Sequence, residues 1–348
     1  MFRRLFSNSA VRAGLSLGSA AVLGHCVSSL NSVSSFRDVD LPFASSLFAE
    51  SRKPPVATIS KTGDYKAVRT AIEQLISEDI NIAPTLLRLA WHASGTFSRS
   101  HNNGGSSGGR IRHSPERQWG ANVGLSPVMD ALEKIKAANP WISYSDLYTL
   151  AGVVAIAEMG GPKVTWRSGR LDVPKGTGIE NGEVEDGRLP NADVASKQPV
   201  PAYVPQDGWS EEMASHIRLI FNRMGFNDRE IVALIGAHAV GRCHPNASGY
   251  EGPWTRDPFG FTNSFYVELL NASNGWHKEQ NSNGSVQYWD KNREIMMLPA
   301  DMVFVQDPIF YGFVVDYANN ADKWSSDFAA AFQKLLELGC ANLQDANV

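Results

Sequence analysis

The chain contains 348 residues, of which 43% are hydrophobic and 20% are charged, enough to build the core of one large domain or two small ones. It has no uninterrupted apolar run long enough to span a membrane and only three Cys, which argues against an integral membrane protein and a disulfide-rich secreted scaffold. The formal net charge is −4, and the three Arg within residues 1–36 contribute +3 without any Lys or acidic residue, so the remainder carries −7. Such a body repels nucleic acid and attracts basic proteins at low salt, so no nucleic-acid partner is expected.

The first residues, MFRRLFSNSAVRAG, are rich in Arg and Ser and lack acidic residues, which is typical of a mitochondrial transit peptide. The next segment, Ala13 to Val27, is apolar but interrupted by Ser, Gly and His25, so it is a weak membrane span and could instead be a sorting signal. An N-terminal tail without a targeting role is the alternative. We expect residues 1–36 to be a transit and sorting segment that directs the protein to the mitochondrial intermembrane space, with weak membrane association at most, and residues 37–60 to be a linker.

From Thr62 onward the apolar spacing is mostly helical, and alternating runs of β-branched residues are scarce, so the body is predicted to be largely α-helical. The expected helices span residues 62–79, 84–97, 127–138, 144–158, 210–224, 228–239, 263–271, 307–317 and 324–338.

Local signals mark several helix ends. Ser143, Ser210 and Asn227 are each followed by acidic residues at the positions that favour a helix start, and Gly160-Gly161-Pro162 is a stop. The stretch from Val173 to Asp207 is rich in Pro, Gly and Asp, which predicts a long surface excursion between two helical halves.

Two segments place reactive side chains inside apolar helices. In Leu87-Arg88-Leu89-Ala90-Trp91-His92, the Arg and the His are four residues apart and share one helix face beside Trp91. In GAHAVGRCH, His238 stands near a helix end, where one ring nitrogen could bind a metal. Taken singly, each segment is also compatible with a buried side chain whose charge or hydrogen bonds are satisfied within the core.

Together, LRLAWH and GAHAVGRCH resemble the distal and proximal sequences of the class I haem peroxidases, the family of cytochrome c peroxidase and ascorbate peroxidase. Further matching pieces occur in order from Thr62 to Leu338: SGGR at 107–110, NVGL at 122–125, PWIS at 140–143, GRLP at 187–190, SGYEGPW at 248–254, MMLPAD at 296–301 and QDP at 306–308.

The resemblance implies an all-α haem peroxidase fold of about ten helices in two halves, with the haem between the halves. It places a single haem peroxidase domain at residues 61–340, with a distal half near 61–172 and a proximal half near 207–340. Residues 341–348 would form a C-terminal tail.

The distal site implied by the resemblance lies in the first segment. His92 matches the base that moves a proton from the near to the far oxygen of hydrogen peroxide, and Arg88 supplies positive charge where the leaving oxygen becomes negative. Trp91 directs its indole N–H toward the oxygen at the iron, and Asn122 matches the residue that orients the His92 ring.

The proximal site implied by the resemblance centres on His238 as the axial ligand of a haem b iron. Asp301 would accept the hydrogen bond from the other ring nitrogen, which gives the imidazole anionic character and favours cleavage of an O–O bond. His244 matches a contact to a haem propionate. Trp254, sixteen residues after His238, matches the Trp that packs against the axial His and bonds to the same carboxylate.

The choice of reductant depends on features that differ between the two branches. In cytochrome c peroxidases the proximal Trp is oxidised to a cation radical, and Met296 and Met297 match a sulfur pair near it that stabilises positive charge. Ascorbate peroxidases recognise their anionic substrate with an Arg and a Lys, at positions occupied here by Ala247 and Ile80. The sequence therefore predicts that cytochrome c reduces the enzyme after its reaction with hydrogen peroxide, which agrees with the acidic body.

The electron exit is predicted near Asp257, three residues past Trp254, where a carboxylate could pair with a Lys or Arg of cytochrome c. Two neighbours depart from this pattern: Arg256 brings positive charge to the same place, and Cys243 stands where the familiar cytochrome c peroxidase has Thr.

Three alternatives remain open at this point. Thr255 and Asp257 partly match a proximal cation site of ascorbate peroxidases, but Ala239 and Thr262 lack the oxygen ligands of that site, so an additional cation stays uncertain. An ascorbate peroxidase or a hybrid using a small reductant is the second alternative. A haem-based peroxide sensor that passes oxidation through Trp254 or Cys243 is the third.

Overall fold

The computed structural model describes residues 63–174, 184–194 and 211–348, all of which belong to one compact unit. This part of the chain is mainly helical, as predicted, with ten α-helices and only short strands. None of the described helices is both long enough and apolar enough to cross a membrane. The predicted transit segment, the linker at 37–60 and the cap at Ser210 lie outside the described residues.

Four helices lie in the first part of the described chain: α1 (Tyr65–Glu78), α2 (Ala83–Ser94), α3 (Ser126–Ala138) and α4 (Tyr144–Glu158). α4 is buried on nearly every side and packs along both α1 and α2. The close approach of α2 depends on Gly152, because a Cβ there would lie 2.4 Å from the Cβ of Ala90. This contact fixes the position of the helix that carries Arg88 and His92.

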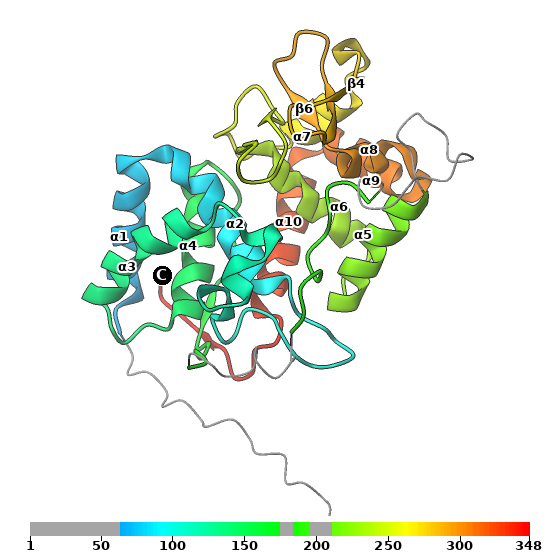
Figure 1. The fold of residues 1–348 in the computed structure, drawn as a ribbon. Coiled ribbons are helices and arrows are strands. Elements are labelled where there is room, and N and C mark those ends of the chain that lie inside the picture. Colours follow the sequence, from blue (N-terminus) through cyan, green and yellow to red (C-terminus); the bar gives the residue numbers. More distant parts are fainter. Residues whose placement is uncertain (1–62, 175–183, 195–210) are drawn as a thin grey trace, which may run out of the picture. The chain divides into compact units, whose positions relative to one another are not determined.

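The other six helices follow from residue 211 onward: α5 (Glu211–Met224), α6 (Asp228–Ile235), α7 (Ser264–Leu270), α8 (Pro299–Gln306), α9 (Pro308–Asn319) and α10 (Ala321–Glu337). Figure 1 shows α10 between the two groups, and it packs against both α2 and α6. α10 therefore joins α2 to α6, the helix that leads into His238.

The helix ends confirm several predicted signals. The Ser143 hydroxyl accepts a hydrogen bond from the Asp146 N–H, and Asn227 and Glu230 form a capping box at the start of α6. α4 ends at Glu158, two residues before Gly160, whose φ of +77° is in the left-handed region that glycine tolerates.

Seven short strands pair into three small sheets among the described residues: β1 (Arg167–Ser168) with β7 (Gln344–Asp345), β2 (Arg242–Cys243) with β3 (Gly252–Pro253), and β4 (His277–Gln280), β5 (Val286–Trp289) and β6 (Met296–Met297) as a three-stranded sheet. Every pairing is antiparallel. The sequence did not predict these strands, because each is four residues or shorter and none shows a sustained alternation.

Three expectations need correction. The helix expected at 228–239 is α-helical only to Ile235 and continues as a 3₁₀ turn, Gly236–Ala239. α8 was not predicted, because its eight residues follow the short strand β6 and are almost uniformly apolar, without a helical period. The stretch 173–207 is not simply a surface excursion, because Arg188 and Leu189 in its described part are buried.

Candidate active site

The distal side of the site is built on α2, with a loop residue behind it. His92 is buried, and its Nδ1 lies 2.8 Å from Oδ1 of Asn122 in the 3₁₀ turn Gly120–Asn122. The Asn122 amide nitrogen donates to the Glu116 carbonyl at 2.8 Å, so its oxygen is the atom that faces His92. Nδ1 therefore carries the proton, and Nε2 of His92 is left as an unprotonated base.

The charge state of the distal pair follows from burial. Burial, with the nearby positive charge of Arg88, lowers the pKa of His92 to about 3, so the ring is neutral at physiological pH. Burial also lowers the pKa of Arg88, although a guanidinium keeps its proton in proteins. The Arg88 guanidinium donates to the carbonyls of Ala121 at 2.7 Å and Val123 at 3.0 Å, which holds it beside the 120–124 turn.

The proximal side is centred on Asp301, at the first turn of α8. One carboxylate oxygen lies 2.9 Å from Nδ1 of His238, and the other accepts the indole N–H of Trp254 at 2.8 Å and the backbone N–H of Leu298 at 2.7 Å. The Asp301 side chain is fully buried, and these three donors compensate for its desolvation.

His238 and Trp254 also contact each other directly. Their rings are stacked, with centroids 4.2 Å apart and planes 20° from parallel. Because Nδ1 of His238 bonds to Asp301, only Nε2 is free to ligate a metal.

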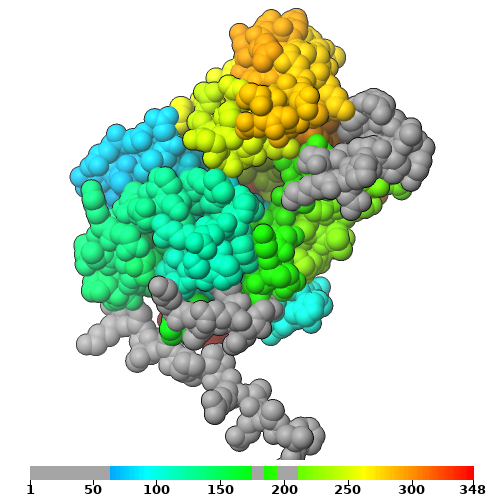
Figure 2. Space-filling model, viewed as in Figure 1, coloured from blue at the N-terminus to red at the C-terminus, as the bar shows by residue number. Residues whose placement is uncertain are grey.

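One large cavity connects the two sides. It has a volume of about 1180 Å³, and its lining includes six of the predicted site residues: Arg88, Trp91, His92, His238, His244 and Trp254. Figure 2 shows the hollow where the segments coloured teal, bright green and yellow-green meet. Asn122 and Asp301 lie behind the lining, each bonded to one of the two His rings.

The size of the cavity and the side chains that line it suit a haem group. The cavity is larger than an ordinary small-molecule pocket. Apolar side chains such as Leu234 and Phe259 make up much of the lining, His238 offers one free ring nitrogen, and Arg242 and His244 could pair with acidic substituents.

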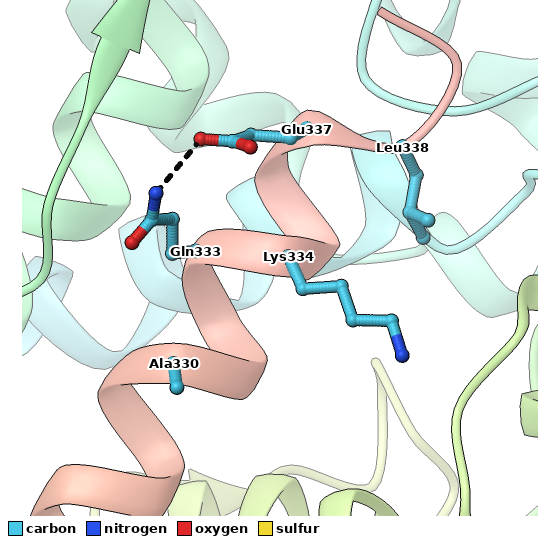
Figure 3. A pocket seen from close by; sticks show the side chains of 5 residues that line it. All are labelled: Ala330, Gln333, Lys334, Glu337 and Leu338. Atoms are coloured by element: carbon cyan, nitrogen blue, oxygen red, sulfur yellow. Dashed lines mark hydrogen bonds between the residues drawn. The ribbon is translucent and has the colours of Figure 1, made fainter.

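A second hollow, of about 410 Å³, lies on the surface of α10. Figure 3 shows that its lining comes from one stretch of chain, with Gln333 donating to Glu337 and Lys334 extending away from that pair. Lys334 forms an ion pair with Glu230, and Glu337 forms one with Arg167, so the charged side chains that line this hollow already have partners. This hollow has no group suited to catalysis.

The residues predicted for electron transfer lie on the proximal side of the fold. Met296 and Met297 are fully buried in β6, whereas Asp257 is exposed and does not line the cavity. The positive charge of Arg256 is offset by ion pairs with three carboxylates, those of Glu268, Asp290 and Glu294. These ion pairs offset the charge that Arg256 brings next to Asp257.

Thr255, one of the two residues that partly match a proximal cation site, has a structural role of its own. The Thr255 hydroxyl donates to the Ala239 carbonyl at 2.6 Å, which fixes the Trp254 loop to the turn that carries His238. No group of three or more His, Cys, Asp or Glu side chains gathers into a metal site among the described residues.

Several residues of the site were not predicted from the sequence. Phe221 of α5 stacks on Trp91 with centroids 5.4 Å apart and planes 8° from parallel. Leu298 supplies an N–H to Asp301, and the segment from Gly187 to Asp193 forms one wall of the cavity. The motif GRLP at 187–190, one of the pieces that resemble the class I haem peroxidases, is the sequence feature that could have indicated this wall.

Comparison with known proteins gives a consistent result. A profile of the family described as "Peroxidase" matches residues 68–320. The chain is 46% identical over 281 residues to "Cytochrome c peroxidase, mitochondrial" of Cryptococcus neoformans var. neoformans, covering 80% of this chain and 68% of the relative. It is also 46% identical to "Putative cytochrome c peroxidase, mitochondrial" of Yarrowia lipolytica, in an alignment that covers 80% of this chain and 90% of the relative. The identity to "Cytochrome c peroxidase, mitochondrial" of Aspergillus fumigatus is again 46%, over 79% of this chain and 70% of the relative.

Proposed function

The chain belongs to the peroxidase family, and from that premise we propose that it is a mitochondrial cytochrome c peroxidase, reducing hydrogen peroxide to water with electrons from ferrocytochrome c. The observation that carries the proposal is the hydrogen-bonded set of His238, Asp301 and Trp254 facing the cavity that His92 and Arg88 also line. We further propose haem b as the cofactor and the intermembrane space as the location.

The proximal residues would hold and tune the cofactor. His238 would ligate the iron through Nε2, and His244 would contact a propionate. The Asp301 carboxylate, by accepting a hydrogen bond from the Nδ1–H of His238, makes the imidazole a stronger electron donor. Bound haem would supply the iron at which the O–O bond is cleaved and a store of oxidising equivalents.

The distal residues would manage the proton and the developing charge. Nε2 of His92 takes the proton from the near oxygen of hydrogen peroxide and returns it to the far oxygen, which leaves as water. Arg88 stabilises the negative charge that develops on the leaving oxygen, and the Trp91 indole offers an N–H to the near oxygen. Asn122 keeps His92 in the tautomer that this transfer requires.

Trp254 would be the electron outlet. Its ring stacks on His238, and its N–H bonds to the Asp301 carboxylate, whose negative charge favours an oxidised, positively charged indole. The buried sulfur atoms of Met296 and Met297 would add polarisable stabilisation. Asp257 would pair with a basic residue of cytochrome c at the nearby surface.

Ascorbate is the less favoured reductant because the expected cations are missing. Ala247 and Ile80, both uncharged, occupy the two positions, and Ala247 lines the cavity. An anionic substrate at this edge therefore lacks its charge-assisted hydrogen bonds there. A sensor that signals through Cys243 is disfavoured because burial raises the pKa of that thiol to about 12, which leaves it unreactive.

The test is steady-state turnover of the haem-loaded protein with hydrogen peroxide, supplied separately with ferrocytochrome c and with ascorbate over a range of salt. We expect rapid oxidation of cytochrome c that slows as salt is added, and slow oxidation of ascorbate. Fast ascorbate turnover with little response to cytochrome c would identify an ascorbate peroxidase, and a single oxidation without cycling would identify a sensor.

A further inference from the structure

A row of three side chains crosses the sheet formed by β4, β5 and β6. The register pairs Trp289 with His277 on one side and with Met296 on the other, and directly paired residues project from the same face of a sheet. Met296 is fully buried, Trp289 is 7% exposed, and the His277 side chain is 42% exposed. The row therefore leads from the core to the surface.

The inner end of this row packs against the strand that leads to Trp254. Gly252 in β3 has no side chain, and a Cβ at that position would lie 2.7 Å from the Trp289 ring and 3.3 Å from Cγ of Met296. Gly252 precedes Trp254 by two residues, a span of at most about 7 Å of extended chain. Trp289 is thus an oxidisable ring separated from Trp254 by a short piece of backbone.

A positive charge covers the outer face of the Trp289 ring. The Arg293 guanidinium lies 5.1 Å from the ring centroid and pairs with Glu279 at 2.5 Å. Arg293 has a φ of +58°, which is uncommon for a residue other than glycine and costs conformational energy. A cation over an indole stabilises the neutral ring and makes removal of an electron from it harder.

We propose that Trp289 is a secondary electron donor to oxidised Trp254, and that Arg293 restricts its use. This inference rests on the proposed function, in which hydrogen peroxide supplies the oxidising equivalents and Trp254 passes them on. One electron moves from the Trp289 indole to oxidised Trp254, so that Trp254 returns to its resting form and Trp289 becomes oxidised, with the indole proton released to water.

Electron transfer from Trp289 to oxidised Trp254 competes with electron transfer from ferrocytochrome c. When ferrocytochrome c is bound, it reduces Trp254 first, and Trp289 stays unchanged. Without a reductant, a second oxidising equivalent from peroxide removes a second electron from Trp289. One water then adds to the twice-oxidised ring with release of one proton and gives a hydroxylated indole, so that Trp289 has lost two electrons and two protons in all and carries a permanent oxygen atom.

The experiment is peptide mapping by mass spectrometry of the haem-loaded enzyme after hydrogen peroxide, with and without ferrocytochrome c. Arg293→Asn removes the charge with a residue that tolerates positive φ, and Arg293→Lys is the matched control that retains the charge. Trp119, which is 8% exposed, reports background oxidation, since no cation of the described residues lies over its ring.

We expect Trp289 to be hydroxylated more than Trp119, about threefold more in Arg293→Asn than in Arg293→Lys, and not at all in Trp254→Phe or with excess ferrocytochrome c. Equal hydroxylation of Trp289 and Trp119, or equal hydroxylation in the two Arg293 variants, would overturn the inference. Turnover of cytochrome c in the same samples distinguishes failure of the proposed function from failure of this inference. Absence of turnover would refute the proposed function, whereas normal turnover with unmodified Trp289 would refute only the role of Trp289 as a secondary electron donor.

Discussion

Asp301 is the residue on which both proximal roles depend. Its two oxygens accept N–H donors from the proposed iron ligand, from the proposed electron outlet and from the backbone of Leu298. A neutral amide at this position could not accept all three, because one of its two polar atoms is a donor.

We therefore expect Asp301→Asn to raise the Fe(III)/Fe(II) reduction potential of the haem-loaded protein, because the His238 imidazole loses anionic character. Spectroelectrochemical titration measures this potential. Asp257→Asn is the matched control, since Asp257 is exposed and does not line the cavity, and it should leave the potential unchanged. The same potential in all three proteins would contradict this role for Asp301.

The lowered pKa of His92 predicts how the peroxide reaction depends on pH. The ring must be neutral to accept a proton, so the second-order rate constant should stay level through the neutral range and fall only as the pH approaches about 3. Stopped-flow absorbance of the haem-loaded protein measures this rate. His92→Leu should be slower by roughly 10²–10⁴-fold and lack the acidic decline, and a decline centred near the ordinary His value would show that burial does not control this group.

The sequence predicts the main site residues through motifs with a fixed spacing, and the structure brings six of them to the lining of one cavity. It does not predict their neighbours. Phe221 reaches Trp91 from a helix far away in the sequence. Leu298 and Glu116 contact Asp301 and Asn122 through backbone atoms, so the identity of their side chains gives no signal of these contacts.

At the scale of elements, helices with strong caps and a clear apolar face were predicted to within a few residues. The elements that were missed, α8 and the β4–β5–β6 sheet, are short, so their existence depends on packing rather than on local preference. The described part of the 173–207 stretch contributes a wall of the cavity, which its Pro, Gly and Asp content did not reveal.

The capping box of α6 matters because this helix leads directly into the turn of His238. Replacing Asn227 by Ala removes the side-chain acceptor for the Glu230 N–H, and we expect a loss of about 1 kcal/mol in the free energy of unfolding. Urea denaturation of the protein measures it. Asn227→Asp keeps an acceptor and should cost little, so equal losses in the two variants would contradict the capping argument.

At the scale of the whole molecule, charge decides which partner approaches. The chain beyond residue 36 carries −7, and near Trp254 the charge of Arg256 is taken up by ion pairs with other carboxylates, while Asp257 is exposed at the surface. A basic partner is therefore attracted both by the overall field and by the surface beside the proposed outlet.

Asp257→Lys should slow the oxidation of ferrocytochrome c at low salt, and the difference from the parent should shrink as salt screens the charge. Steady-state kinetics over a salt series measures both effects. Asp322→Lys, an exposed reversal of the same size on α10, is the matched control for net charge. If the two variants behave alike, Asp257 has no local role in docking.

The most direct test of the account is a comparison of the haem-loaded parent with Trp254→Phe in stopped-flow mixing, first with hydrogen peroxide and then with ferrocytochrome c. Phe keeps an aromatic ring but loses the N–H bonded to Asp301 and is much harder to oxidise. We expect the peroxide step to be unchanged, because His92 and Arg88 are untouched, and the oxidation of cytochrome c to fall by orders of magnitude. Cytochrome c oxidation at the parental rate in Trp254→Phe would contradict the assignment of Trp254 as the electron outlet.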